Sequence, residues 1–215
     1  MKIKQAINLH KGSTAPLVLG LMFAYDNFTI APWIYLSLHG TYGLMWLIKD
    51  ALYPDKQWEE ETSIGQGSIV FLVLGIYWIA PFILISSGTE PPAPLLALGI
   101  TTNIMGVLLH FCSDAQKYFT LKYRSGLITE GFFSRCRNPN YLGEILIYLG
   151  FAIVSQSWIP FAILGFFAAT VFVPNMLKKD RSLSRYPEFA AYKQNSGLLI
   201  PKLFVNTTEV GTTAQ

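Results

Sequence analysis

Long apolar segments alternate with short polar ones along this chain, and most charged residues lie in the polar segments. Between residues 63 and 112 the only formal charge is Glu90, and between residues 138 and 177 it is Glu144. A helix of about 20 apolar residues crosses the roughly 30 Å of hydrocarbon in a bilayer. The pattern therefore predicts an all-α, polytopic membrane helix bundle.

The apolar segments predict five membrane-spanning helices. An apolar piece at 17–25 precedes the first of them and is too short to cross alone, so an alternative count makes it part of a sixth helix. The fourth is also short, and we expect it to begin inside the preceding polar cluster or to lie tilted. The five expected helices lie at about 30–48, 68–85, 94–112, 141–154 and 159–177.

Composition agrees with this fold class and argues against others. Hydrophobic residues make up 52% of the 215 positions and charged residues only 13%, whereas soluble domains are about a quarter charged. A net charge of +3 without a long basic run argues against nucleic-acid binding. Cys112 and Cys136 are too few for a disulfide scaffold, and the three histidines are too scattered for a metal motif. We therefore expect no metal site.

Basic residues indicate the orientation in the membrane. They concentrate in the loop 113–137 and in the segment from Lys178 onwards, which flank the predicted C-terminal hairpin. The positive-inside rule places both segments, and the C-terminus, in the cytoplasm. Five spans then put the N-terminus outside, whereas Lys2, Lys4 and Lys11 favour the inside; a sixth span would remove this conflict. We expect the inner membrane in a bacterium, and the endoplasmic reticulum or another organelle membrane in a eukaryote.

Polar side chains gather at three of the expected helix ends. SDAQKYFTLKY follows the third span, RCRNPNYLGE opens the fourth, and KKDRSLSRYPEFAAYK follows the fifth. Arginine forks bind phosphate oxygens, a tyrosine ring can stack on a base, and a helix start offers free N–H groups. This collection suits a ligand with several phosphates and an aromatic ring. Membrane topology and anionic lipid also favour basic residues here, and Asn138-Pro139-Asn140 fits a plain helix start.

Further candidates lie inside the expected spans. Glu144 would stand one turn into a membrane helix, where a carboxylate is costly unless paired, so we treat it as a functional candidate. Tyr35, His39 and Tyr42 are spaced four and three residues apart and share a helix face. They would either donate protons to a buried substrate carbonyl or form a packed, hydrogen-bonded core cluster.

One stretch, GLITEGFFSRCRNPNYLGEILIYLGFA, resembles the C-terminal half of the steroid 5-alpha-reductase superfamily, which includes sterol reductases. SDAQKYFTLKY resembles the Asp-x-Gln-Lys-x-x-Phe element of that superfamily, and RYPEFAAYKQNSGLLIPKLF resembles its Tyr-rich tail ending near Ile-Pro. The resemblance covers about residues 109–204. It implies an NADPH-dependent reductase that transfers hydride to an activated C=C bond of a lipid-like substrate.

The resemblance also implies roles for individual residues. Glu144 would accept a hydrogen bond from the nicotinamide carboxamide. His39 stands where the superfamily carries a substrate-side histidine, but Ser37 replaces the usual tyrosine and no upstream glutamate has a counterpart, so Tyr35 and Tyr42 become substitute catalytic candidates. The implied cofactor contacts are Asp114, Lys117, Arg124, Arg137, Asn138, Asn140, Tyr141, Gly143, Glu144, Arg181 and Tyr186.

These inferences divide the chain into three regions. We expect residues 1–112 to form transmembrane helices lining a cavity for a lipid substrate. Residues 113–204 would form a steroid-reductase-like region, in which C-terminal helices and cytoplasmic loops bind the cofactor. Residues 205–215 read as a disordered polar tail.

Two other functions stay open. Isoprenylcysteine and phospholipid methyltransferases share a similar hairpin with an Arg-His-Pro-x-Tyr-x-Gly element and bind S-adenosylmethionine. Asn138 replaces that histidine here, and Glu144 directly after Gly143 favours the reductase. The third possibility is a non-catalytic subunit of a membrane complex that keeps the fold. Membrane lipids and a hydrophobic small molecule are the expected partners.

Overall fold

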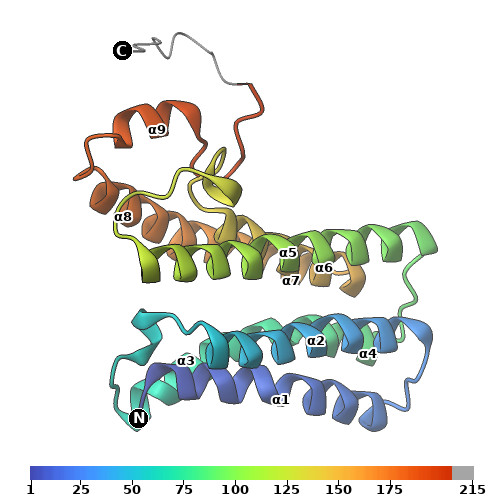
Figure 1. Cartoon of the computed structure of the whole chain (residues 1–215). Helices are drawn as coiled ribbons and strands as arrows, with labels where there is room; N and C mark the ends of the chain where they lie inside the picture. Colours follow the sequence, from blue (N-terminus) through green and yellow to red (C-terminus); the bar gives the residue numbers. More distant parts are fainter. Residues whose placement is uncertain (205–215) are drawn as a thin grey trace, which may run out of the picture.

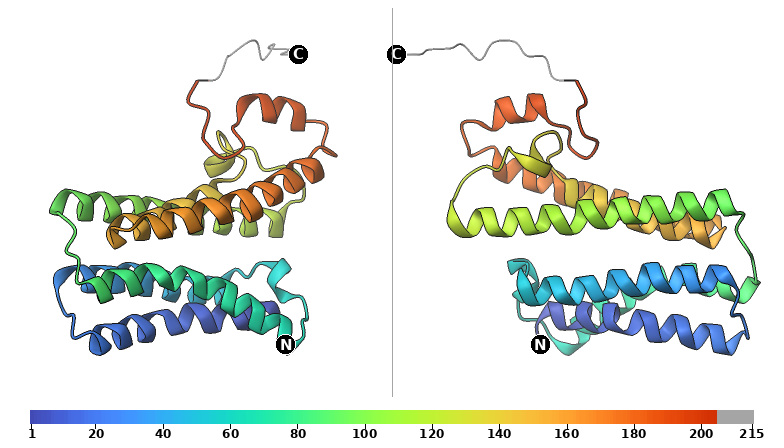
Figure 2. Two further views of the ribbon diagram at one scale, coloured as in Figure 1. Left: turned by 180° about the vertical axis from the view of Figure 1, so that it is seen from behind. Right: turned by 45° about the vertical axis from the view of Figure 1, so that its right-hand side comes forward.

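The computed structural model describes residues 1–204, which form an all-helical bundle of two layers (Figure 1). One layer is made by the N-terminal helices: α1 (Ile3–Ala24), α2 (Ile30–Leu52), α3 (Ile64–Gly75) and α4 (Ile79–Ser87). The other is made by α5 (Ala93–Tyr123), α6 (Pro139–Ser155), α7 (Trp158–Phe167) and α8 (Val173–Leu183), with the short α9 (Phe189–Asn195) beyond them. Figure 2 shows the same two layers from other directions.

Helix boundaries follow local chemistry. Pro139 is the first residue of α6 and Pro94 the second residue of α5, positions in the first turn where a missing N–H costs nothing. Ser63 caps α3 by accepting a hydrogen bond from the Gln66 N–H at 3.2 Å. Gly88 ends α4 with a φ of +65°, a left-handed conformation that glycine adopts without strain.

The predicted membrane helix bundle is confirmed. Three helical segments are long and apolar enough to cross a membrane: Ile64–Ser87, Ala93–Tyr123 and Trp158–Leu183. The first contains a 3₁₀ turn at Ile76–Trp78 and the last a π turn at Ala168–Phe172. As expected, α6 begins within the polar cluster, at Pro139.

The N-terminal segment is a full helix. α1 has 22 residues, so the apolar piece at 17–25 is the second half of a longer element rather than an isolated fragment. Its first half is polar, yet His10, Lys11 and Thr14 are buried against neighbouring helices. A hydropathy pattern cannot reveal this burial, because the covering residues come from distant parts of the chain. Residues 1–204 thus contain six long helical segments, as in the alternative count, and three of these segments have the length and hydropathy of a membrane span.

Successive helical segments run antiparallel, so their connections alternate between the two ends of the bundle (Figures 1 and 2). At one end lie the connections 25–29, 88–92 and 156–157, whose only charged residues are Asp26 and Glu90. All 16 lysines and arginines belong to the helices or to the opposite end. With six helices the N-terminal lysines join the other basic residues, and the conflict with the positive-inside rule disappears.

Direct contacts attach the N-terminus to this basic end. The Met1 amino group donates to the Thr62 carbonyl at 3.0 Å, and the Ile3 N–H donates to the Glu60 carbonyl at 3.1 Å. Lys2 and Lys4 both pair with Glu59. The start of α1 is thereby held against the loop between α2 and α3.

Glycines let α5 and α6 pack closely. A Cβ added at Gly143 would overlap the backbone of His110, and one at Gly106 would lie 2.6 Å from the Gly143 carbonyl oxygen. Further along the same contact, a Cβ at Gly150 would lie 2.7 Å from the Gly99 oxygen. Gly143, which the resemblance implies as a cofactor contact, thus lies directly against the α5 backbone. The closeness of the two backbones fixes how the first turns of α6 stand beside the end of α5.

An apolar groove opens elsewhere on the bundle, between α1, the α3–α4 segment and α7. Its volume is about 410 Å³, and its walls include Leu17, Trp78 and Ile163. None of the predicted site residues lines it. The predicted site residues lie instead at the basic end and between the two layers.

Candidate functional site

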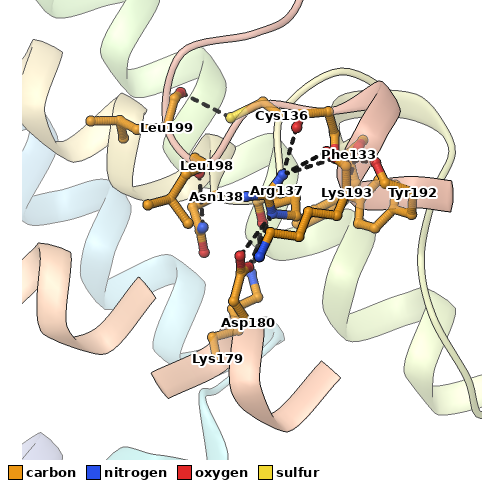
Figure 3. A network of polar contacts seen from close by, with 11 residues as sticks. Phe133, Cys136, Arg137, Asn138, Lys179, Asp180, Tyr192, Lys193, Leu198 and Leu199 are labelled. Atoms are coloured by element: carbon orange, nitrogen blue, oxygen red, sulfur yellow. Dashed lines mark hydrogen bonds and ion pairs between the residues drawn. The ribbon is translucent and has the colours of Figure 1, made fainter. Parts of the chain in front are cut away.

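Arg137 points into the protein at the basic end (Figure 3). It is 5% exposed, and its Nε lies 3.0 and 3.1 Å from the two carboxylate oxygens of Asp180 on α8. Its Nη1 donates to the Ser196 carbonyl at 2.5 Å, and Lys179 donates to the Arg137 carbonyl at 2.9 Å. The guanidinium thus joins α8 and the segment after α9 to the start of α6.

Neighbouring residues attach the same C-terminal segment. Asn138 donates to the Leu198 carbonyl at 2.9 Å rather than capping α6, and the Cys136 thiol donates to the Leu199 carbonyl at 3.0 Å. The Tyr192 hydroxyl donates to the Phe133 carbonyl at 2.7 Å. Burial raises the pKa of the Cys136 thiol and that of the Tyr192 hydroxyl above their ordinary values. The polar residues of RCRN therefore serve mainly to bind the segment 196–199 that follows α9.

Two asparagines retain spare hydrogen-bonding capacity. The side-chain oxygens of Asn138 and Asn140 are buried and have no hydrogen-bond partner among residues 1–204. The backbone carbonyl of Asn140 contacts His110 Nδ1 at 3.1 Å, and His110 Nε2 is likewise buried without a partner in the described part of the chain. Buried polar groups are normally satisfied, so these three atoms distinguish this end of the bundle.

An ion-pair cluster of alternating charge lies beside these asparagines. Lys49, at the end of α2, lies 2.5 Å from Asp55 and 3.2 Å from Asp114; Lys117, on α5, lies 3.1 and 3.6 Å from the same two residues. Burial alone would raise the pKa of Asp55, but Lys117 and Lys49 outweigh it and hold that pKa below its ordinary range. The cluster connects the two layers through the α2–α3 loop.

A second polar cluster lies between the layers. The Lys11 ammonium donates to the hydroxyls of Tyr42 and Tyr148, each at 3.1 Å. The Tyr35 hydroxyl lies 3.1 Å from His39 Nδ1, and the His39 ring stacks on Phe151 with centroids 4.1 Å apart. The three predicted residues of α2 thus do face one buried cluster, with Lys11 and Tyr148 as additional members.

Glu144 lies in the second turn of α6, one helical turn before Tyr148 of this inner cluster and about one turn after Tyr141. It is partly buried. Glu144 therefore stands between the polar surface end and the buried polar interior.

The remaining predicted cofactor residues lie further out. Arg124 is exposed at the end of α5 and pairs with Glu130. Arg181 is exposed on α8, and the half-buried Tyr186 accepts a hydrogen bond from Arg185 at 3.2 Å. Their contact with a cofactor stays a prediction.

Sequence reasoning missed several members of these clusters. Tyr148 lies four residues after Glu144 on α6, so helical spacing alone could have indicated it. Lys49 was visible as a lysine at the end of an apolar span. Lys11 and Asp55 gave no such signal, because their partners lie on other elements: Lys11 contacts a residue 137 positions away.

Comparison with known proteins places the chain in a family. Residues 54–196, two thirds of the chain, match the model of a family described as "Protein of unknown function (DUF1295)". The chain belongs to the DUF1295 family. This family falls within the steroid-reductase-like superfamily, so the resemblance seen in the C-terminal half is confirmed at that level.

A curated relative of this DUF1295 protein is the cobalt-zinc-cadmium resistance protein CzcN of Cupriavidus metallidurans. The two are 28% identical over 127 residues, which is 59% of this chain and 52% of the relative. The chain thus spans about half the length of the curated relative it matches.

The DUF1295 match includes some of the candidate site residues and leaves out others. All the implied cofactor contacts, from Asp114 to Tyr186, lie within residues 54–196. The buried residues of α1 and α2, including Lys11 and His39, lie before that range. The family match therefore covers the implied cofactor contacts and Tyr148, but not the members of the interior cluster on α1 and α2.

Proposed function

We propose that this DUF1295 protein is a membrane-bound, NADPH-dependent reductase that acts on a C=C bond of a lipid-like substrate such as a steroid, sterol or other enone. One observation carries the proposal. Asn140, an implied cofactor contact on α6, touches His110 at 3.1 Å, and the His110 ring lies 6.4 Å from that of Tyr42, in the buried cluster that also holds Tyr35 and His39. Two sets of residues, inferred separately from the sequence, are thus neighbours.

The residues at the surface end suit a dinucleotide in chemical type. Asn138 and Asn140 have buried acceptor atoms without partners, which match the N–H and O–H donors of a carboxamide and a ribose. Lys117 and Arg181 supply positive charge for phosphates, and Tyr141 offers a half-buried ring. Arg137 and Asn138 would contribute mainly by holding the C-terminal segment in place.

NADPH would supply the hydride. The protein would bind the cofactor and the substrate, orient them toward each other and exclude water from them. Glu144, the deepest of the cofactor residues, would accept a hydrogen bond from the carboxamide. That bond would place the reactive ring at the inner end of the surface cluster, beside the apolar interior where a lipid-like substrate would lie. His39 and the tyrosines would then face the substrate.

Ligand binding to the purified full chain in nanodiscs tests the proposal. We expect NADPH to raise the thermal midpoint, because saturating ligand at about 100 times its dissociation constant adds close to 2.7 kcal/mol. Glu144→Gln should weaken NADPH binding roughly tenfold or more, since a hydrogen bond to a charged group contributes about 1.5–3 kcal/mol.

Glu90→Gln is the matched control, because it makes the same chemical change at an exposed residue in the connection at the opposite end of the bundle. It should change NADPH affinity much less than Glu144→Gln. A midpoint shift with S-adenosylmethionine alone would instead support the methyltransferase. Binding of neither ligand would favour a non-catalytic subunit.

A further inference from the structure

Lys11 is a buried cation whose hydrogen-bond partners are neutral. It is 4% exposed, and its ammonium contacts the hydroxyls of Tyr42 and Tyr148 and lies 4.2 Å from the centre of the Tyr42 ring. No carboxylate of residues 1–204 lies within 4.0 Å of it, so it forms no ion pair in the described chain; Glu144 acts on it from further away. An intramembrane charge held in this way is costly and marks a functional position.

The ammonium keeps one hydrogen-bond donor to offer. A protonated lysine has three N–H donors, and the two tyrosine hydroxyls accept from two of them. Neighbouring groups also have unused capacity: the Tyr77 hydroxyl and His39 Nε2 are buried without hydrogen-bond partners among residues 1–204. Tyr77 stacks directly on Tyr148, with ring centroids 3.8 Å apart.

These groups come from both layers of the bundle. Lys11 lies on α1, Tyr42 and His39 on α2, Tyr77 between α3 and α4, and Tyr148 on α6. The hydrophobic core around them includes Phe151 and Phe111. A small polar centre within an apolar interior fits an amphiphile with a single oxygen function and a hydrocarbon body.

We propose that Lys11 is a further catalytic residue, which donates a hydrogen bond to the carbonyl oxygen of the lipid-like substrate. Tyr42 and Tyr148 hold its ammonium in place. The inference rests on the proposed reductase function, and it specifies the substrate as an enone, in which the carbonyl is conjugated to the C=C bond that is reduced.

The chemistry balances with the proposed cofactor. NADPH would supply a hydride to the β-carbon of the enone and become NADP⁺, and the π electrons of the C=C bond would move onto the carbonyl oxygen. The Lys11 N–H group stabilises the negative charge on that oxygen. A proton delivered from water then adds to the α-carbon as the carbonyl re-forms, so the substrate gains one hydride and one proton.

Chemical capture by the wild-type protein tests the site without a cofactor. trans-2-Hexadecenal, a lipid-like enal, would be added with sodium cyanoborohydride. An amine and an aldehyde form an imine with loss of water, and cyanoborohydride reduces the imine to a stable amine that peptide mass spectrometry locates. We expect an adduct on Lys11. Long-chain methyl enone at about ten times its dissociation constant should lower it roughly tenfold by occupying the site, whereas the matching alkane should not.

Exposed Lys122 is the internal reference, because its labelling should not respond to either competitor. Labelling of Lys122 without labelling of Lys11 would overturn the inference, as would equal protection of Lys11 by the alkane. Because the wild-type chain is used, a failure of a variant to fold cannot obscure the result.

A variant separates this inference from the proposed function. Lys11→Met should keep NADPH binding, because Lys11 is not among the cofactor residues. It should lose the extra rise in thermal midpoint that the long-chain enone gives to the wild type over the matching alkane. If the wild type shows enone-sensitive Lys11 labelling without binding NADPH, the reductase proposal fails and the carbonyl site stands. If it binds NADPH while Lys11 stays unlabelled, the carbonyl site fails alone.

Discussion

Individual residues acquire their roles from partners that the local sequence does not show. Arg137 and Arg124 were equal candidates for phosphate binding. In the structure Arg137 is buried against Asp180, whereas Arg124 is exposed and pairs with Glu130. Guanidinium groups suit phosphates and carboxylates alike, so the residue type could not distinguish a ligand contact from an internal one. Burial and geometry make that distinction.

At this scale Asp55 gives a prediction about pH. Its lowered pKa means that the folded protein holds the carboxylate charged more strongly than the unfolded chain does. The stabilisation is therefore complete above about pH 4, the ordinary aspartate value, and is lost as the pH falls through the lower folded pKa. Asp55→Asn should cost about 2 kcal/mol at pH 7, because Lys49 and Lys117 lose a charged partner. It should also flatten the acid dependence of the thermal midpoint.

Glu60→Gln is the control for Asp55→Asn. Glu60 is exposed in the same loop, so its loss should leave both the thermal midpoint at pH 7 and its acid dependence nearly unchanged. Parallel acid profiles for the wild type and Asp55→Asn would contradict the assigned role of the ion-pair cluster.

At the scale of elements, the contact between α5 and α6 depends on small residues. Gly143→Ala would place a methyl group against the His110 backbone and the Gly106 carbonyl, neither of which can move without separating the helices. We expect a loss of about 1–3 kcal/mol, typical of overpacking, measured as a lower thermal midpoint in detergent.

Gly20→Ala provides the comparison for this helix contact. A Cβ at Gly20 on α1 meets no atom within 4 Å, so this variant should be neutral or slightly more stable. Equal effects of the two substitutions would show that close packing of α5 on α6 is not what Gly143 provides.

At the scale of the whole molecule, the antiparallel helices place both ends of the described chain on one side. The N-terminus binds the 59–62 segment, and residues 189–202 lie over the start of α6, at the same basic end (Figure 1). We predict that this end is cytoplasmic, because the opposite connections contain neither lysine nor arginine. Protease sites added at position 1 and after residue 204 should both be cut in inside-out vesicles.

The connection 88–92, at the opposite end of the bundle, provides the control. A protease site inserted at Gly88 should be cut only in right-side-out vesicles. Cleavage of the two terminal sites from different sides would contradict the six-helix arrangement.

Local composition predicts the membrane class, five of the helices and the basic end. Transfer of apolar residues into lipid and the positive-inside bias both depend on composition within short windows. Local composition also marks Glu144 and the His39 face as candidates, since a polar residue within an apolar helix stands out. That the polar start of α1 is a buried helix is seen only in the folded chain. There Lys11 is accommodated by tyrosines 31 and 137 positions away, and no local pattern can carry information about contacts at that separation.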